Sequence, residues 1–156
     1  MTTIRQLVPL LFVEDIAASA AFYQHRLGFS MTEQWEPEGK LAWCRLVRDG
    51  AAVMLQQACP EEDGPAKGRG RGVVFYFNCD DADGFHAELT SRGLAAPQPQ
   101  AAYYGMNQIS LQDPDGYELC FQSPIRQQQP AATVTASPPP ASRGRESNTH
   151  RGRPAG

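Results

Sequence analysis

Long hydrophobic runs are absent from this sequence of 156 residues. No run approaches the roughly 18 apolar residues that a membrane-spanning helix requires. Residues 7–13 are apolar, but only Arg5 supplies basic charge before them. Glu14 and Asp15 follow them, where a signal peptide would carry small residues at its cleavage site. We therefore expect no membrane association and no secretion signal.

Cysteine pairs with metal-binding or redox spacing are also absent. Cys44, Cys59, Cys79 and Cys120 form no CxxC motif. All but Cys59 lie within or at the end of apolar strand-like runs, where a free thiol behaves as a small hydrophobic side chain. This usage is typical of a reducing compartment, so we expect a cytoplasmic protein.

Large apolar residues disappear after position 126. Residues 127–156 are rich in Pro, Ala, Arg and Gly, have no aromatic residue and no aliphatic side chain larger than that of Val134. Such a segment cannot bury enough surface to offset the entropy of ordering, which predicts a disordered tail. Residues 1–126 are predicted to be the globular domain. They hold 16 acidic against 10 basic residues, which argues against nucleic acid as a partner.

The globular part contains an internal repeat. The turn Asp49-Gly50 recurs as Asp115-Gly116 at an offset of 66, and each turn precedes an apolar, strand-like run. The helical stretches bounded by Asp15–Gly28 and by Asp80–Gly93 are related by an offset of 65. Two copies indicate a pair of modules, because solenoids usually need three or more repeats.

Each module is predicted to have the element order βαβββ. In the first, Asp15 caps a helix that Gly28 ends, and Asp49-Gly50 is a hairpin signal between the last two strands. We expect strands at 7–13, 29–35, 41–47, 51–57, 72–78, 94–99, 108–112 and 117–122, helices at 16–27 and 81–92, and a flexible linker at 59–71. A helix covering one face of each sheet leaves the other face free. The prediction is an α+β fold in which two curved mixed sheets surround a shared groove, with the helices outside.

The element order is accompanied by two motifs, Phe22-Tyr23 with Leu27-Gly28-Phe29, and Asp113-Pro114-Asp115-Gly116 in the second module. Together they resemble the vicinal oxygen chelate superfamily, which includes glyoxalase I, bleomycin-resistance proteins, fosfomycin-resistance enzymes and extradiol dioxygenases. The resemblance covers about residues 4–124, with modules at about 4–58 and 72–124. It implies a homodimer, because members of this length are commonly dimers. Fold alone does not imply function.

The resemblance also implies where a metal would bind, on the opening and closing strands of each module. The corresponding positions here hold Val8, Met54, Val73 or Val74, and Cys120. Hard divalent ions need oxygen or imidazole donors, which these side chains lack. We therefore expect no metal and no cofactor, as in bleomycin-resistance-like members without metal ligands.

Other residues are poor replacements for these ligands. His25 and His86 lie on the predicted helices outside the sheets, and His150 lies in the tail. Glu118 shares a strand face with Cys120 and could be joined by amide oxygens, but such a set suits a catalytic metal badly. A nucleophilic Cys120 would need a nearby base, and no histidine is expected there, so a buried and inert thiol is favoured. No catalytic residue is predicted.

The groove is expected to be apolar and aromatic with a few polar groups, which is typical of small-molecule pockets. Its predicted ligand-binding residues are Trp43, Met54, Gln56, Tyr104, Asn107, Glu118, Cys120 and Gln122. For Trp43 and Tyr104 individually, plain core packing is an alternative at least as strong as ligand contact. Gln56 and Gln122 occupy equivalent places in the two modules, and an inward amide requires a partner. Glu118 is the one acid expected in the groove and suits a cationic ligand.

Three functions are left open by the sequence. The first is metal-independent small-molecule binding that sequesters an antibiotic or an aromatic or cationic metabolite, as the resemblance to bleomycin-resistance proteins implies. The second is an enzyme, a glyoxalase-like lyase or isomerase or a dioxygenase, with a displaced metal or with acid/base residues such as Glu118 and Tyr104. The third is a non-catalytic partner domain that associates through the tail.

Overall fold

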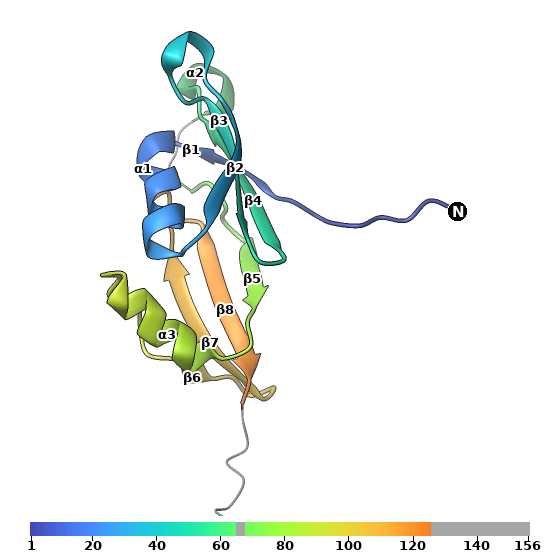
Figure 1. The fold of residues 1–156 in the computed structure, drawn as a ribbon, viewed down its shortest axis with the longest axis vertical. Helices are drawn as coiled ribbons and strands as arrows, with labels where there is room; N and C mark the ends of the chain where they lie inside the picture. The colour runs from blue at the N-terminus through green and yellow to red at the C-terminus, as the bar shows by residue number, and fades with distance from the viewer. Residues whose placement is uncertain (65–67, 126–156) are drawn as a thin grey trace, which may run out of the picture. The chain divides into compact units, whose positions relative to one another are not determined.

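The computed structural model describes residues 1–64 and 68–125 (Figure 1). These residues belong to one compact unit, Met1–Arg126. The predicted disordered tail lies outside the described residues, and so does the middle of the predicted linker.

The first module forms a four-stranded mixed sheet with the order β1-β4-β3-β2. Its strands are β1 (Leu10–Val13), β2 (Ser30–Trp35), β3 (Trp43–Arg48) and β4 (Ala51–Gln57), with β1 parallel to β4 and the other pairs antiparallel. Short helical turns, η2 (Pro37–Gly39) and α2 (Pro60–Asp63), precede β3 and follow β4.

The helix of the first module has two parts, α1 (Ile16–Ala21) and the π-helical η1 (Phe22–Arg26). Asp15 begins it as predicted, because its carboxylate accepts a hydrogen bond from Ala18 N at 3.0 Å. Gly28, with a φ of 74°, follows its end in the left-handed region that favours glycine. The π-helical turn carries Tyr23 to a fully buried position.

The second module repeats this plan with the sheet order β5-β8-β7-β6. Its elements are β5 (Val74–Asn78), α3 (Ala82–Ser91), β6 (Gln100–Ala101), β7 (Met106–Gln112) and β8 (Glu118–Pro124), with β5 parallel to β8. The matching strand orders confirm the α+β fold with two like βαβββ modules.

Prolines explain the main differences in strand boundaries. The first strand begins at Leu10 and not at Leu7, since Pro9 has no N–H and offers only its carbonyl, which accepts from Met54 N at 2.8 Å. The prediction of a strand at 94–99 is wrong: β6 comes later, after Pro97 and Pro99, neither of which can donate to a sheet.

Each helix covers one face of its own sheet, as Figure 1 shows. Helix α1 packs on β3 and β4, and α3 packs on β7 and β8. The strands alternate accordingly, so that Leu11, Cys44, Leu46 and Leu55 are buried on the helix side of the first sheet. Within the described residues, no helix of the same module covers the opposite face of either sheet.

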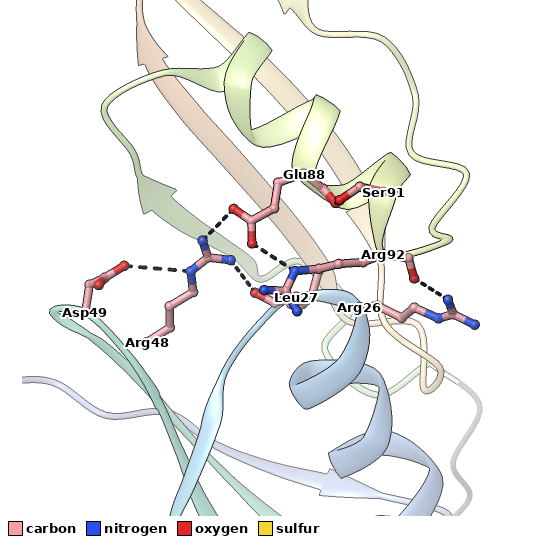
Figure 2. Close-up of polar contacts among 7 residues, drawn as sticks. All are labelled: Arg26, Leu27, Arg48, Asp49, Glu88, Ser91 and Arg92. Carbon is pink, nitrogen blue, oxygen red and sulfur yellow. Dashed lines mark hydrogen bonds and ion pairs between the residues drawn. The ribbon is translucent and has the colours of Figure 1, made fainter.

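The cores of the two modules are continuous through a series of aromatic contacts. The ring of Tyr23 lies 5.8 Å from that of Phe29, and Phe29 lies 6.1 Å from Phe77 of the second module. Phe77 in turn stacks on Phe121 at 4.8 Å. Polar contacts also join the modules. Arg48, at the end of β3, donates to Glu88 on α3 at 2.8 Å (Figure 2).

Candidate ligand-binding site

The free face of the first sheet brings together three of the predicted ligand-binding residues. The register places Gln56 between Phe12 and Trp43, and Met54 between Leu10 and Arg45. Side chains on one face of a strand are separated by two residues, so Met54 and Gln56 share this face with Trp43. These three residues are half-buried in the described chain.

A surface hollow of about 420 Å³ lies at one end of this face. It is lined by Trp35, Ala42, Trp43, Gln56 and Gln57. Trp35 pairs with Trp43 across β2 and β3, and it is 62% exposed. The amide of Gln57 accepts from Ile16 N at 3.0 Å and donates to Glu14 O at 2.6 Å, which fixes this wall to the start of α1.

Sequence reasoning missed Trp35 as a member of this site. The signal was available in the pairing of the hairpin, because Trp35 and Trp43 face each other across it. Two indole rings beside one amide make a surface that can stack on a planar ligand and form a hydrogen bond with it.

The free face of the second sheet carries a chain of amide hydrogen bonds. Gln122 donates to Asn78 Oδ1 at 3.0 Å and accepts from Gln108 Nε2 at 3.0 Å, and Gln108 also contacts the hydroxyl of Tyr104. Desolvation and a hydrogen bond with Tyr76 raise the pKa of Tyr104. The amide of Gln122 therefore finds its expected partners within the protein, and Asn78, Gln108 and Tyr76 join the predicted residues on this face.

Cys120 and Glu118 lie on this same free face, two residues apart on β8. Cys120 pairs with Tyr76 on β5 and with Ser110 on β7. It is 2% exposed, and burial raises the pKa of its thiol, as expected for an unreactive cysteine. Glu118 is exposed at the edge of this row, opposite Val74 and Gln112.

Asn107 is not brought to this face. It pairs with the buried Ser123 on the helix side of the sheet, and its amide donates to Asp83 of α3 at 3.1 Å. The remaining predicted residues form two groups. Trp43, Met54 and Gln56 lie on the first sheet, and Glu118, Cys120 and Gln122 lie on the second, where Tyr104 joins them from the turn before β7 through its contact with Gln108.

In the observed register, Leu10 is the β1 neighbour of Met54, and Tyr76 is the β5 neighbour of Cys120. Val8 and Val73 precede β1 and β5, and Val74 is the first residue of β5. Within residues 1–64 and 68–125, no three His, Cys, Asp or Glu side chains gather into a group that could hold a metal ion.

Among the histidines, His25 is exposed on η1, and a ring nitrogen of His86 lies 3.2 Å from the carbonyl oxygen of Ala96. No helix in the described part of the chain is long and apolar enough to cross a membrane.

The paired βαβββ modules, each with one free sheet face, define the class of protein. The family model of the Glyoxalase/Bleomycin resistance protein/Dioxygenase superfamily matches residues 3–121, and the chain belongs to this superfamily. The resemblance seen in the sequence is thereby confirmed. A comparison with curated protein sequences found no match.

Several solved structures share the fold. TnmS3, an antibiotic binding protein from Streptomyces sp. CB03234, is 23% identical, with 80% of this chain and 98% of that chain covered and a TM-score of 0.61. The bleomycin resistance determinant encoded on the transposon Tn5 is 22% identical, with 78% and 99% covered and a TM-score of 0.63. A bleomycin-binding protein complexed with bleomycin is 22% identical, with 77% and 98% covered and a TM-score of 0.59.

Proposed function

We propose that this protein binds a small molecule without a metal and sequesters it, as an antibiotic-binding or metabolite-binding member of its superfamily. The observation that carries the proposal is the hollow in which Trp35 and Trp43 lie beside the amide of Gln56. The described residues that line it offer stacking area and a hydrogen bond but no nucleophile or general base, which supports binding and not turnover.

The ligand class that suits this site is a planar aromatic compound with hydrogen-bonding groups and positive charge. The indole rings accept the planar part, and the amide of Gln56 offers a donor and an acceptor in the hollow. Gln122 and Glu118 lie on the free face of the second sheet and would add an amide and a negative charge where a second copy of the chain brings that face to the hollow. The shared fold with an antibiotic binding protein and with a bleomycin-binding protein supports an antibiotic as the ligand.

We further propose that a second copy of the chain completes the site. Large apolar side chains are exposed on both free faces: Leu10 and Trp35 on the first sheet, and Val74 and Tyr76 on the second. Contact between two copies would bury these side chains and place residues from both groups around one ligand. Size-exclusion chromatography with light scattering tests this, and a monomer at micromolar concentration that still binds ligand would contradict it.

The protein is proposed to act in the cytoplasm and not on nucleic acid. All four cysteines are free, in keeping with a reducing compartment. The acidic excess of residues 1–126 opposes binding to phosphate backbones.

Tryptophan fluorescence provides the test of the binding site, since both tryptophans of the chain line the hollow. Titration with bleomycin and with a panel of aromatic cationic antibiotics should change the emission and raise the melting temperature for at least one compound. Trp43→Leu should weaken binding tenfold or more, about 1.4 kcal/mol, whereas Tyr103→Leu, at a fully exposed side chain, should leave it unchanged.

The metal-free part of the proposal is tested by repeating the titration after dialysis against EDTA. Affinity should be the same before and after chelation. Loss of binding that added Zn²⁺, Ni²⁺, Mn²⁺ or Fe²⁺ restores would contradict the proposal and favour an enzyme with a displaced metal.

A further inference from the structure

A second cavity, of about 670 Å³, lies where the β3–β4 hairpin faces β5 and α3. It is separate from the hollow at Trp35, and the two share no lining residue among those the structure describes. The hairpin residues Arg48–Ala51 form one side of it. Phe29, Phe77, Phe85 and Phe121 line it as well, so its inner wall is aromatic.

The internal repeat allows this cavity to be compared with the same place in the other module. There, the corresponding turn is hydrogen-bonded to the first module. Asp115 accepts hydrogen bonds from Ser19 Oγ at 2.7 Å and from Glu14 N at 2.6 Å. The hydroxyl of Tyr117 reaches across to donate to Phe12 O at 3.0 Å.

Smaller residues stand at the two corresponding positions around the first hairpin. By the offsets of the repeat, Ala51 corresponds to Tyr117, and Gly84 corresponds to Ser19. Both Ala51 and Gly84 line the cavity. The missing phenol ring leaves at Ala51 the space that Tyr117 occupies at the other hairpin. The position beside Gly84 is taken by the carboxylate of Asp81, whose Oδ2 lies 3.1 Å from where a Cβ would stand.

The charges around the cavity are mostly negative. Its lining, within the described residues, includes Asp49, Asp80, Asp81 and Glu88 against a single base, Arg48. Arg48 pairs with Glu88 at 2.8 Å and with Asp49 at 3.7 Å, and Glu88 also pairs with Arg92 at 2.8 Å, as Figure 2 shows. The Arg48 guanidinium also lies 5.0 Å from the centre of the Phe85 ring, so this aromatic wall already accommodates one cation.

We propose that this cavity is a binding site for a small organic cation with an aromatic or alkyl body. The aromatic wall accepts the aromatic or alkyl body. The carboxylates that line the cavity favour a cation over a neutral or anionic compound of the same shape. The proposal does not depend on the hollow at Trp35, whose lining residues are different; it shares Tyr76 and Asn78 with the free face of the second sheet, which the proposed second copy would cover.

The test uses three probes that share one skeleton and differ in charge: phenethylammonium, phenethyl alcohol and phenylacetate. Amide NMR spectra of the nitrogen-labelled full chain are recorded during titration with each. Phenethylammonium should shift the amides of Asp49–Ala51 and Gly84–Glu88 and should bind at least threefold more tightly than the alcohol, while phenylacetate should bind most weakly. Equal affinity for all three probes, or shifts confined to Trp35 and Trp43, would overturn the proposal.

Two variants and one control substitution locate the site. Asp49→Asn keeps a residue that tolerates the observed positive φ of 49° and should weaken phenethylammonium binding about threefold, as expected for a screened surface charge. Glu61→Gln, an exposed acid outside the cavity lining, should have no effect. Ala51→Tyr restores the residue of the other module and should abolish binding with an unchanged melting temperature. Unchanged binding in Asp49→Asn, or in a folded Ala51→Tyr protein, would refute the assignment.

Discussion

The hydroxyl of Tyr23 donates a hydrogen bond to Oδ2 of Asp113 at 3.0 Å, across 90 residues of sequence and between the two modules. The repeat relates Tyr23 to Glu88 of the second module, and Glu88 accepts from Arg48 at the end of the other hairpin. Each module thus uses its helix to hold the hairpin of the other. One contact is a buried phenol–carboxylate pair, and the other is a half-exposed ion pair.

Removing the phenol hydroxyl should destabilise the chain. Tyr23→Phe leaves Asp113 with the backbone N–H groups of Asp115 and Tyr117 but without its donor from the first module. A buried acceptor that loses one partner costs about 1–2 kcal/mol, and urea unfolding should show this loss. Tyr103→Phe, at a fully exposed ring, should leave the midpoint unchanged. An equal midpoint for Tyr23→Phe and the natural chain would contradict the assigned role.

Asp113 should also give stability a pH dependence. Burial raises the pKa of this carboxyl, and the backbone N–H of Tyr117 and the hydroxyl of Tyr23 oppose the shift only in part. The folded chain therefore holds the proton more tightly than the unfolded chain. Between the unfolded and the folded pKa, the free energy of unfolding falls as the pH rises. Asp113→Asn should lack this component, so the stability difference between the two proteins, followed by urea unfolding from acidic to neutral pH, should change across that window. A pH-independent difference would contradict the raised pKa.

The Arg48–Glu88 contact should be worth more than a fully exposed pair. The two side chains are 26% and 33% exposed, and Arg48 also donates to Leu27 O at 2.6 Å. Arg48→Met should cost about 1–2 kcal/mol, because the carbonyl and the carboxylate both lose a charged donor. A double-mutant cycle with Glu88→Gln should give a coupling of about 0.5–1 kcal/mol. The more exposed Arg45–Glu33 pair provides the control cycle, and its coupling should be smaller.

The four thiols should differ in their reactivity toward a thiol reagent. Cys59 is exposed and should react first in the native protein. Cys44 and Cys120 are buried, and burial raises the pKa of both thiols, so they should react only at the rate of unfolding. Mass spectrometry of the labelled peptides distinguishes the sites. Fast labelling of Cys120 would show that it is an activated thiol and would favour a catalytic role for this residue.

Several elements could be predicted from sequence because their signals are local. Asp15 is a capping residue whose side chain needs only a backbone N–H one helical turn away, and Gly28 is needed where φ turns positive. The hairpin signal Asp49-Gly50 is equally local, which is why β4 was predicted with its observed bounds.

The differences occur where pairing with a neighbouring strand decides which face of the sheet a residue occupies. Asn107 was assigned to the groove, yet its pairing with Ser123 puts it on the helix side, since a shift of one residue reverses the face of a strand. Trp35 and Tyr76 were missed for the same reason: each becomes a candidate site residue only through a neighbour on another strand, Trp43 or Cys120.

By itself, the sequence determined that there are two like modules, what elements each contains and which family they belong to. These properties depend on residue periodicity, turn residues and a repeat, all of which can be read along the chain. Only the tertiary structure decided how the modules hold each other and where space remains between them. Both outcomes depend on residues far apart in sequence, such as Ala51 on β4 and Phe85 on α3, which line one cavity only because the fold brings their elements together.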